Sequence, residues 1–352
     1  MLVILALAAP SLAATLTVDP SDAAAYATIS AAIAASTSGD NIDVVAGSYA
    51  ECIDTNGKSL LITGTSGSAS TTLAAAGACT NAVSVDQGET VSLTGFTITN
   101  ATQRGVYVLS SSFTGDDLVF SGLGSSSSHG NALYADASSV DLNDVTVSSG
   151  SANYGSIFIT NASDLGVSES AFNGNYAVYG GAIFANGTGN YVTVDETTFS
   201  DNYTSYYGGA IYAGATDTVT SNASVYTDNW GYYGHGGAIY LYTGASLTST
   251  DDTFTGNHAY YWTSGYAGGA IYGFSANAIS VTGAEFDANY NYYGADIYMR
   301  DGGALTVADS TFTDHTAYYG GSIYVVGAAT VDISDSDFAS GYAVYSGGDL
   351  HL

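Results

Sequence analysis

Two places in the chain hold residues suited to hydrolytic chemistry. Asp116 and Asp117 form an adjacent carboxylate pair, and His235 stands between two glycines. Carboxylates and a histidine can donate and remove protons at a glycosidic bond. The two places are far apart in the chain, however, and no basic residue for substrate binding follows the histidine. His235 also lies inside a repeated string that explains its neighbours. These residues therefore do not predict a hydrolase.

Proton abstraction from a uronic acid, or chemistry at a metal ion, has equally little support. Arg300 is the only Lys or Arg in the strongest repeats, and we expect it to form a surface ion pair with Asp296. Asp116-Asp117 and Asp251-Asp252 could bind calcium weakly, but solvated turns explain them as well. None of the five histidines shows metal-ligand spacing: His129, His235, His258, His315 and His351. We predict no catalytic residue, no metal site, no cofactor, and a protein that is not an enzyme.

A five-residue string, Gly-Gly-Ala-Ile-Tyr, recurs along most of the chain. Three copies occupy 208–212, 236–240 and 268–272, and near copies occupy 180–184, 294–298, 320–324 and 347–351. Weaker relatives lie upstream, and the spacing between neighbouring copies is 24 to 32 residues. A unit of this size cannot bury its own apolar face, so the period indicates a solenoid of stacked repeats.

Each repeat carries three short apolar stretches. In the repeat that begins at Ile297, Met299 follows two residues later, Leu305 and Val307 form the second stretch, and Phe312 marks the third. Alternation with period two predicts strands with one face inward, hence an all-β parallel β-helix with three strands per coil and about 11–12 coils. Residues 23–36 are the one convincing helix, expected to cap the N-terminal end.

The third stretch has its own motif, Phe-x-x-Asn, which occurs at 172–175, 199–202, 254–257 and 286–289. An Asn at the same turn of every coil can stack its amide in a hydrogen-bonded ladder. The N-terminal segment, a small helix followed by Gly-Asp-x-Ile-x-Val, resembles the opening of right-handed β-helix proteins with the pectin-lyase-like fold. The alternation of Phe-x-x-Asn with Gly-Gly-Ala-[Ile/Leu/Val] over about residues 83–352 resembles the repeat of polymorphic outer membrane proteins. That resemblance implies an exported β-helical passenger at a cell surface, often adhesive.

The termini and cysteines bear on export. Residues 1–14 have an apolar run that ends in small residues, which predicts a signal peptide cleaved after Ala13. Cys52 and Cys79 lie 27 residues apart, about one repeat, and we expect a disulfide between them; two free thiols are the alternative. We divide the rest into a cap with the first coils (15–82) and the repeats (83–352). The chain stops inside a copy of the motif, so we expect its C-terminus to be truncated.

The charge of the chain restricts its partners. Three basic residues stand against 32 acidic ones, for a formal charge of −29. Such a surface repels nucleic acid and anionic membranes. No stretch is long enough to predict a transmembrane segment. A glycan or a protein on a neighbouring cell remains as a partner, at a secreted or outer-membrane-associated location.

One aromatic follows the apolar residue of each repeat. If Ile297 and Met299 point into the core, then Asp296, Tyr298 and Arg300 point outward. The same register gives one outward row, which we call the aromatic ladder: Tyr107, Tyr134, Phe158, Phe184, Tyr212, Tyr240, Tyr272, Tyr298 and Tyr324. It is either a binding stripe for a glycan or protein, or a device that stabilises the coils. We predict a structural or adhesive surface protein, with a carbohydrate-binding or polysaccharide-degrading β-helix (lyase or hydrolase) as the alternative.

Overall fold

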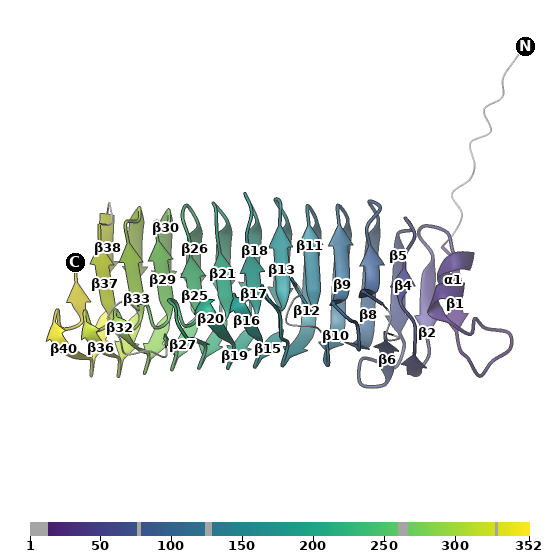
Figure 1. Cartoon of the computed structure of the whole chain (residues 1–352), viewed down its shortest axis with the longest axis horizontal. Coiled ribbons are helices and arrows are strands. Elements are labelled where there is room, and N and C mark those ends of the chain that lie inside the picture. Colours follow the sequence, from purple (N-terminus) through teal and green to yellow (C-terminus); the bar gives the residue numbers. More distant parts are fainter. Residues whose placement is uncertain (1–12, 76–78, 124–128, 260–266, 328–329) are drawn as a thin grey trace, which may run out of the picture.

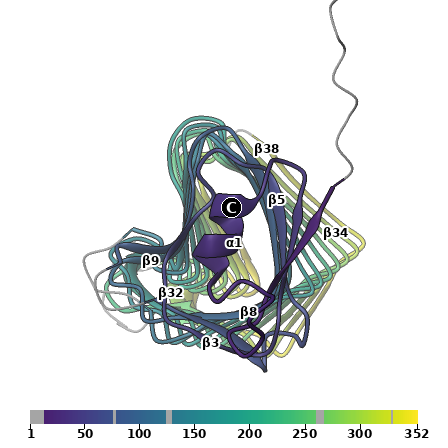
Figure 2. The ribbon, with the colours of Figure 1, turned by 90° about the vertical axis from the view of Figure 1, so that its right-hand side faces the viewer.

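The computed structural model describes residues 13–75, 79–123, 129–259, 267–327 and 330–352. These residues form a single row of parallel coils with one helix at its N-terminal end (Figure 1). Viewed along the row, successive coils superimpose around a common interior (Figure 2). The predicted all-β solenoid of about 12 turns with a single short helix is confirmed. The predicted signal peptide lies, except for its last two residues, outside the described residues.

The strands stack coil upon coil into three parallel sheets. The largest sheet, which we call the long sheet, contains β1 (Thr15–Val18), β2 (Asn41–Val44), β3 (Gly47–Tyr49), β5 (Leu60–Gly64), β6 (Thr71–Ala74), β8 (Thr90–Thr99), β10 (Ser112–Phe120), β12 (Ser139–Ser148), β14 (Asp164–Ser168), β15 (Ala171–Asn173), β18 (Tyr191–Asp195), β19 (Thr198–Ser200), β22 (Thr218–Asn222), β23 (Val225–Thr227), β26 (Ser246–Thr250), β27 (Thr253–Thr255), β30 (Ala278–Thr282), β31 (Glu285–Asp287), β34 (Ala304–Ala308), β35 (Thr311–Thr313), β38 (Thr330–Ser334) and β39 (Asp337–Ala339). The second, the repeat sheet, contains β4 (Ile53–Asp54), β7 (Asn81–Val85), β9 (Arg104–Leu109), β11 (Leu133–Asp136), β13 (Ile157–Thr160), β17 (Ile183–Ala185), β21 (Ile211–Ala213), β25 (Ile239–Leu241), β29 (Ile271–Phe274), β33 (Ile297–Arg300), β37 (Ile323–Val326) and β41 (Leu350–His351). The third contains β16 (Tyr176–Tyr179), β20 (Tyr203–Tyr207), β24 (Trp230–Gly231), β28 (His258–Ala259), β32 (Tyr290–Tyr293), β36 (Thr316–Tyr319) and β40 (Tyr342–Ser346).

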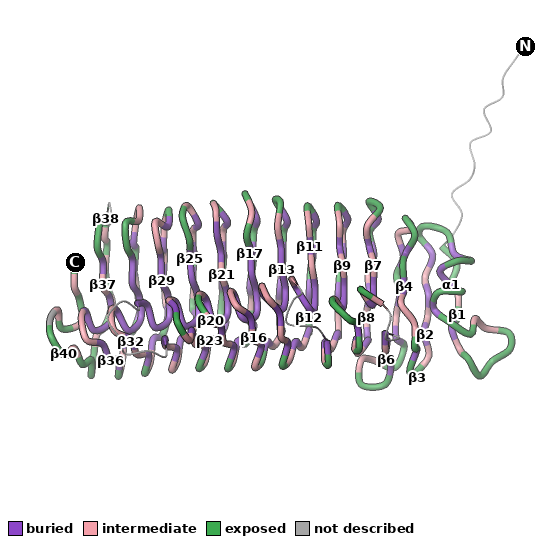
Figure 3. Tube along the Cα trace, viewed as in Figure 1, coloured by how far each residue is buried: buried purple, intermediate pink, exposed green. Residues whose placement is uncertain are grey.

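The interior is filled by columns of like residues, because each strand pairs in register with its equivalent in the next coil. Ile211 of β21 pairs with Ile183 and Ile239, and all three side chains are fully buried. One column consists of aromatic rings, and neighbouring centroids such as those of Phe254 and Phe286 lie 4.8 Å apart. Burial is continuous along the inside of the row, whereas exposure is concentrated at the turns (Figure 3).

Helix α1 (Ile29–Ala35) closes the N-terminal end of the core. Its side chains Ile29, Ala32 and Ile33 are buried, and the Thr28 side chain caps its first turn. The carboxylate of Glu51 accepts hydrogen bonds from the backbone N–H groups of Ile29 and Ser30, at 2.8 and 2.9 Å. An acid at a helix N-terminus stabilises it. The predicted capping helix is therefore present, but shorter than residues 23–36, because residues 23–28 form turns and a bridge before this cap.

The Phe-x-x-Asn motif forms the expected ladder of buried amides. From Asn175 to Asn257, each Asn side chain donates Nδ2–H to Oδ1 of the next Asn and to a backbone carbonyl of the preceding coil. From Asn202 to Asn289, each Oδ1 also accepts the backbone N–H of the previous Asn. The Nδ2···Oδ1 distances run from 2.9 to 3.1 Å. Its members, all fully buried, are Asn175, Asn202, Asn229, Asn257 and Asn289. The ladder thus satisfies polar groups that a tight turn would otherwise bury unpaired.

Cys52 and Cys79 are joined by a disulfide, with their Cα atoms 6.2 Å apart. The bond links the coil that follows α1 to the next one. In the chain-entropy model, a closed loop of this length contributes roughly 3–4 kcal/mol to the free energy of unfolding.

The structure contradicts the predicted side-chain direction at one residue. Asp296 does not point outward with Tyr298 and Arg300, since it lies in the turn before β33 and is fully buried. Strand alternation does not extend into that turn. Arg300 pairs instead with its neighbour Asp301, at 3.2 Å between Nε and Oδ2.

Candidate functional site

The aromatic ladder lies on the outer side of the repeat sheet, one ring per strand from β9 to β37. Neighbouring rings are stacked, with centroids from 4.6 Å (Phe184 and Tyr212) to 5.5 Å (Tyr107 and Tyr134) apart. In-register parallel pairing imposes this spacing, because equivalent residues of adjacent strands lie about 4.8 Å apart. Each ring face is therefore occupied by the next ring, and the ladder offers ring edges and hydroxyl groups to its surroundings.

The ladder is more covered than a flat exposed stripe would be. A second row of aromatic residues, from the turns before the repeat sheet, packs against it. The ring of Tyr207 lies 4.6 Å from that of Tyr240, and the ring of His235 lies 4.6 Å from that of Tyr272. The buried members of the ladder are Phe158, Phe184, Tyr240, Tyr272 and Tyr298, while Tyr107, Tyr134, Tyr212 and Tyr324 are half-buried. The open apolar stripe expected from the sequence is therefore replaced by a two-row aromatic cluster.

A cleft of about 510 Å³ opens between this cluster and a third row of side chains. The third row follows the ladder by two positions on the same coils, so it also points outward. It includes Tyr242, whose side chain is 41 % exposed, and Phe274, with ring centroids 5.7 Å apart. The Arg300 guanidinium lies 5.8 Å from the centre of the Phe274 ring. The described residues that line it are Tyr154, Tyr179, Phe184, Asn186, Tyr207, Tyr212, His235, Tyr240, Tyr242, Tyr272, Phe274 and Arg300.

Gly214 shapes the middle of the cleft. It occupies the third-row position between Asn186 and Tyr242, and the Tyr212 ring leans over it. A Cβ atom on Gly214 would lie 2.9 Å from Oδ1 of Asn186 and 3.1 Å from a carbon of the Tyr212 ring. A side chain there would therefore force the Asn186 amide to move and the Tyr212 ring to shift by a few tenths of an ångström.

Burial keeps His235 and three phenols of the cleft in their neutral forms near pH 7. Burial, and to a lesser extent the nearby positive charge of Arg300, lowers the pKa of His235 to about 4. Nδ1 of His235 accepts the backbone N–H of Ala267 at 3.0 Å, which places the ring proton of the neutral form on Nε2. Burial also raises the pKa of the Tyr212, Tyr240 and Tyr272 hydroxyls. The phenols therefore remain protonated and act as hydrogen-bond donors.

The lining combines hydrogen-bond donors, apolar ring surface and one cation, and no described lining residue is Asp or Glu. The carboxylate pair of ordinary glycoside hydrolysis is thus missing from the described lining of the cleft. His235 and the phenols are the groups at which a proton could be moved, and Arg300 could hold an anionic or strongly polar substituent.

The structure does not bring the other sequence candidates together with the cleft. Oδ1 of Asp116 accepts a hydrogen bond from Asn143, and Asp117 binds the backbone N–H and hydroxyl of Ser68. Asp252 is fully buried and accepts hydrogen bonds from Ser249 and Ser224. Across the described ranges there is no group of three or more His, Cys, Asp or Glu side chains placed to hold a metal ion. Within the same ranges no helix is long and apolar enough to cross a membrane.

Comparison with known proteins identifies the architecture. A family model described as "Right handed beta helix region" matches residues 112–286. The chain is a right-handed parallel β-helix. A comparison with curated proteins finds no match. The polymorphic outer membrane protein repeat is not among these findings.

Two solved structures resemble the chain. The A-module of the mannuronan C-5 epimerase AlgE4 from Azotobacter vinelandii is 14% identical, with a TM-score of 0.33, over 91% of this chain and 93% of that one. The catalytic unit of a thermostable alpha-1,3-glucanase from Streptomyces thermodiastaticus is 13% identical, with a TM-score of 0.31. This second match covers 91% of the present chain and 65% of the glucanase chain.

Both of these structures are carbohydrate-acting enzymes by name, and the prediction that the chain is not an enzyme is corrected accordingly. At these identities the likeness extends to the fold alone and identifies no catalytic residue here. The physical reason for the error is that a linear sequence reveals only polar residues that stand close together along the chain. The cleft instead collects side chains from several successive coils, and Asn186, Tyr242 and Phe274 were missed. They could have been found from their spacing, since each stands two residues after a member of the aromatic ladder.

Proposed function

We propose that this protein is a carbohydrate-active β-helix that binds a segment of a polysaccharide in the aromatic cleft. The observation that supports this most directly is the lining itself. Protonated phenols, an amide and a guanidinium lie next to exposed ring surface, the mixture of polar and apolar contacts that sugars require. The structure has this mixture along one continuous hollow rather than scattered over the surface.

The shape of the cleft favours an extended ligand. The third row of its lining runs from Asn186, beside β17, to Arg300 on β33. These are four strand spacings apart, or roughly 19 Å at ~4.8 Å per strand. A groove of this length parallel to the solenoid axis fits a short run of sugar units better than a compact metabolite.

The proposal predicts that the third row of side chains is needed for glycan binding. Replacing Tyr242 and Phe274 with alanine should weaken the binding of a cognate glycan by at least about tenfold, because both rings expose surface while the ladder beneath stays packed. Affinity can be measured by calorimetry against a panel of neutral and uronic-acid oligosaccharides. The same mixtures should be assayed for new reducing ends, unsaturated uronates and epimerised sugars.

Tyr191→Ala is the matched control, because this tyrosine is 57 % exposed on the long sheet and does not line the cleft. Equal losses of affinity in the control and the cleft variant would contradict glycan binding in the cleft. The absence of binding across the whole panel would contradict it too. Product formation by the wild type that is lost in the cleft variant would identify the cleft as an active site.

We also propose that the protein is exported and displayed at a cell surface, as in the polymorphic outer membrane protein family. Supporting this are the regular pairing of Phe-x-x-Asn with the Gly-Gly-Ala motif and the disulfide between Cys52 and Cys79. The proposed divisions are a signal-peptide segment at 1–14 that contains the cleavage site after Ala13, a cap with the first coils at 15–82, and the repeats at 83–352. We expect N-terminal sequencing of the secreted protein to begin at Ala14, and protease treatment of intact cells to degrade it. Retention of Met1, or protection in intact cells, would contradict export.

A further inference from the structure

The asparagine ladder ends in a buried cluster of ionisable residues. Phe286 and Phe312 pair in register, so His315 occupies the position that Asn289 holds one coil earlier. The residue before each repeat Ile changes in the same coils. It is alanine in four successive earlier repeats but Asp296, Ser322 and Asp349 in the last three. In both columns, titratable side chains (His315, Asp296 and Asp349) thus appear in the last coils.

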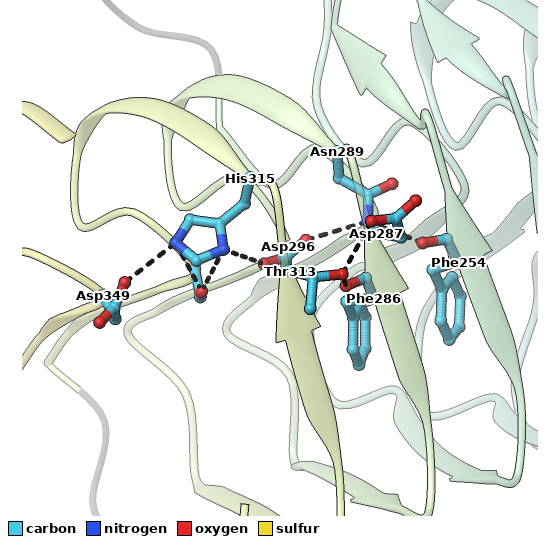
Figure 4. A network of polar contacts seen from close by, with 9 residues as sticks. Phe254, Phe286, Asp287, Asn289, Asp296, Thr313, His315 and Asp349 are labelled. Carbon is cyan, nitrogen blue, oxygen red and sulfur yellow. Dashed lines mark hydrogen bonds and ion pairs between the residues drawn. The ribbon is translucent and has the colours of Figure 1, made fainter. Parts of the chain in front are cut away.

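The cluster is almost sealed from solvent. Asp296, His315 and Ser322 are fully buried, and only the Asp349 carboxylate is partly exposed. His315 lies between two acids, with Nε2 3.1 Å from Oδ1 of Asp349 and Nδ1 3.8 Å from Oδ2 of Asp296 (Figure 4). The Ser322 hydroxyl lies 2.9 Å from the same Nδ1.

One oxygen of the cluster is unsatisfied. Oδ1 of Asp296 accepts the side-chain N–H of Asn289 at 2.9 Å, which is the last bond of the ladder. Oδ2 of Asp296 is buried and has no hydrogen-bond partner among the described residues. Desolvation outweighs the Asn289 and Ser322 side chains that favour the ionised form of Asp296. A buried carboxylate here is therefore costly unless a proton or a cation compensates its charge.

The other charged groups near the cluster add to this cost. Besides Asp349, the acids whose charge bears on Asp296 or His315 are Asp287 and Asp314. No Lys or Arg is among the groups that act on either residue. Burial raises the pKa of Asp296 and lowers the pKa of His315, so the pair favours a state with one proton between them. The loss of that proton would leave unbalanced negative charge inside the fold.

We propose that the Asp296–His315 cluster is a pH-sensitive contact that holds the C-terminal coils together while one proton is bound and loosens them when the proton leaves. The unfolded chain loses this proton near the ordinary pKa of histidine, about 6.5. The folded cluster releases this proton at a higher pH than the unfolded chain does. It therefore stabilises the fold below about pH 6.5, and this stabilisation is lost as the pH rises. The affected segments are β36, β37 and β41, each of which begins directly after a residue of the cluster. Alkaline conditions would therefore open this end of the solenoid before the rest.

The test is hydrogen exchange on the full chain between about pH 5 and pH 9, reported as protection relative to the unstructured chain. We expect protection in β36 and β37 to fall by at least about tenfold as the pH rises, the equivalent of one pKa unit. Protection in β21 and β22 should change much less. If protection in the wild type changes with pH by the same factor in both regions, the proposal is overturned.

The chain itself supplies the matched variant. Asp296→Ala together with His315→Asn restores the residues found at these positions in the preceding coils, so the neutral ladder continues for one more coil. The double variant should retain β36 and β37 protection at about pH 9. If its protection falls with pH as in the wild type, the cluster is not responsible. Should the variant fold poorly, the ring-proton NMR titration of His315 in the wild type decides, because a resonance that follows an ordinary solvent-exposed histidine would also refute the proposal.

Discussion

Replacing Asn229 with alanine is expected to lower the free energy of unfolding by roughly 3–5 kcal/mol, since several buried polar groups lose their partner at once. Oδ1 of Asn229 accepts both the backbone N–H and the side-chain N–H of Asn202, at 3.1 and 3.0 Å. Its own Nδ2 donates to the Phe199 carbonyl at 2.9 Å and to Asn257. Each buried group left unpaired costs on the order of 1–3 kcal/mol, and the small alanine also leaves a void.

Asn222→Ala is the control for this substitution. Asn222 is exposed and its side chain makes one bond, to Asp195 at 2.6 Å, so its loss should cost less than about 1 kcal/mol. Guanidinium unfolding followed by circular dichroism measures both variants, and hydrogen exchange shows whether the damage stays within neighbouring coils, as the one-dimensional energetics of solenoids predicts. A similar loss in the two variants would mean that the ladder is not a principal source of stability.

The fold was predictable because the same sequence pattern recurs in every coil of a solenoid. The strings at Ile211, Ile239 and Ile271 each predict an inward residue, and in-register stacking turns three local predictions into one column. The Asn ladder followed in the same way from the spacing of Phe-x-x-Asn. The prediction failed at Asp296, where a turn interrupts the strand and alternation no longer determines which way a side chain points.

The cleft was less predictable, because its depth depends on packing between rows. The sequence placed Tyr240 and Tyr272 outside the core but could not show that Tyr207 and His235 from the preceding turns would cover them. The periodic pattern also contained no sign that Tyr212 leans over Gly214. Such contacts join residues at different positions of the repeat, and their geometry is set by turn conformation.

A second large effect is the dependence of the free energy of unfolding on pH, caused by Asp252. Asp252 stands at a turn position that Ser170, Thr197 and Ser224 occupy in earlier coils, where each side-chain oxygen accepts a backbone N–H of the coil before. Asp252 accepts the Ser224 backbone N–H at 2.8 Å, and the Ser249 hydroxyl donates to its other oxygen. Its side chain is fully buried, and burial raises its pKa to about 6 despite these hydrogen bonds.

The sign of the pH dependence follows from that shift. The carboxyl binds its proton more tightly in the folded chain than in the unfolded chain, where its pKa is about 3.8. Its contribution to stability is therefore fully present below about pH 3.8 and is lost as the pH rises to about 6. Above that pH the folded protein carries a buried carboxylate, at a cost on the order of 1–3 kcal/mol.

Asp252→Asn removes this charge and keeps the shape of the side chain. The variant should match the wild type at about pH 4 and exceed it by about 1–3 kcal/mol near pH 7 to 8, because only the ionised form is penalised. Thermal and denaturant unfolding across this range measures the difference, and Asp251→Asn, an exposed neighbour, is the control. Since the Asp252 effect is complete by about pH 6, it separates from the alkaline loosening at His315. A constant difference at every pH would show that the substitution acts through its hydrogen bonds. A difference that is absent at about pH 4, grows as the pH rises to about 6 and stays constant above it would establish that Asp252 titrates inside the fold.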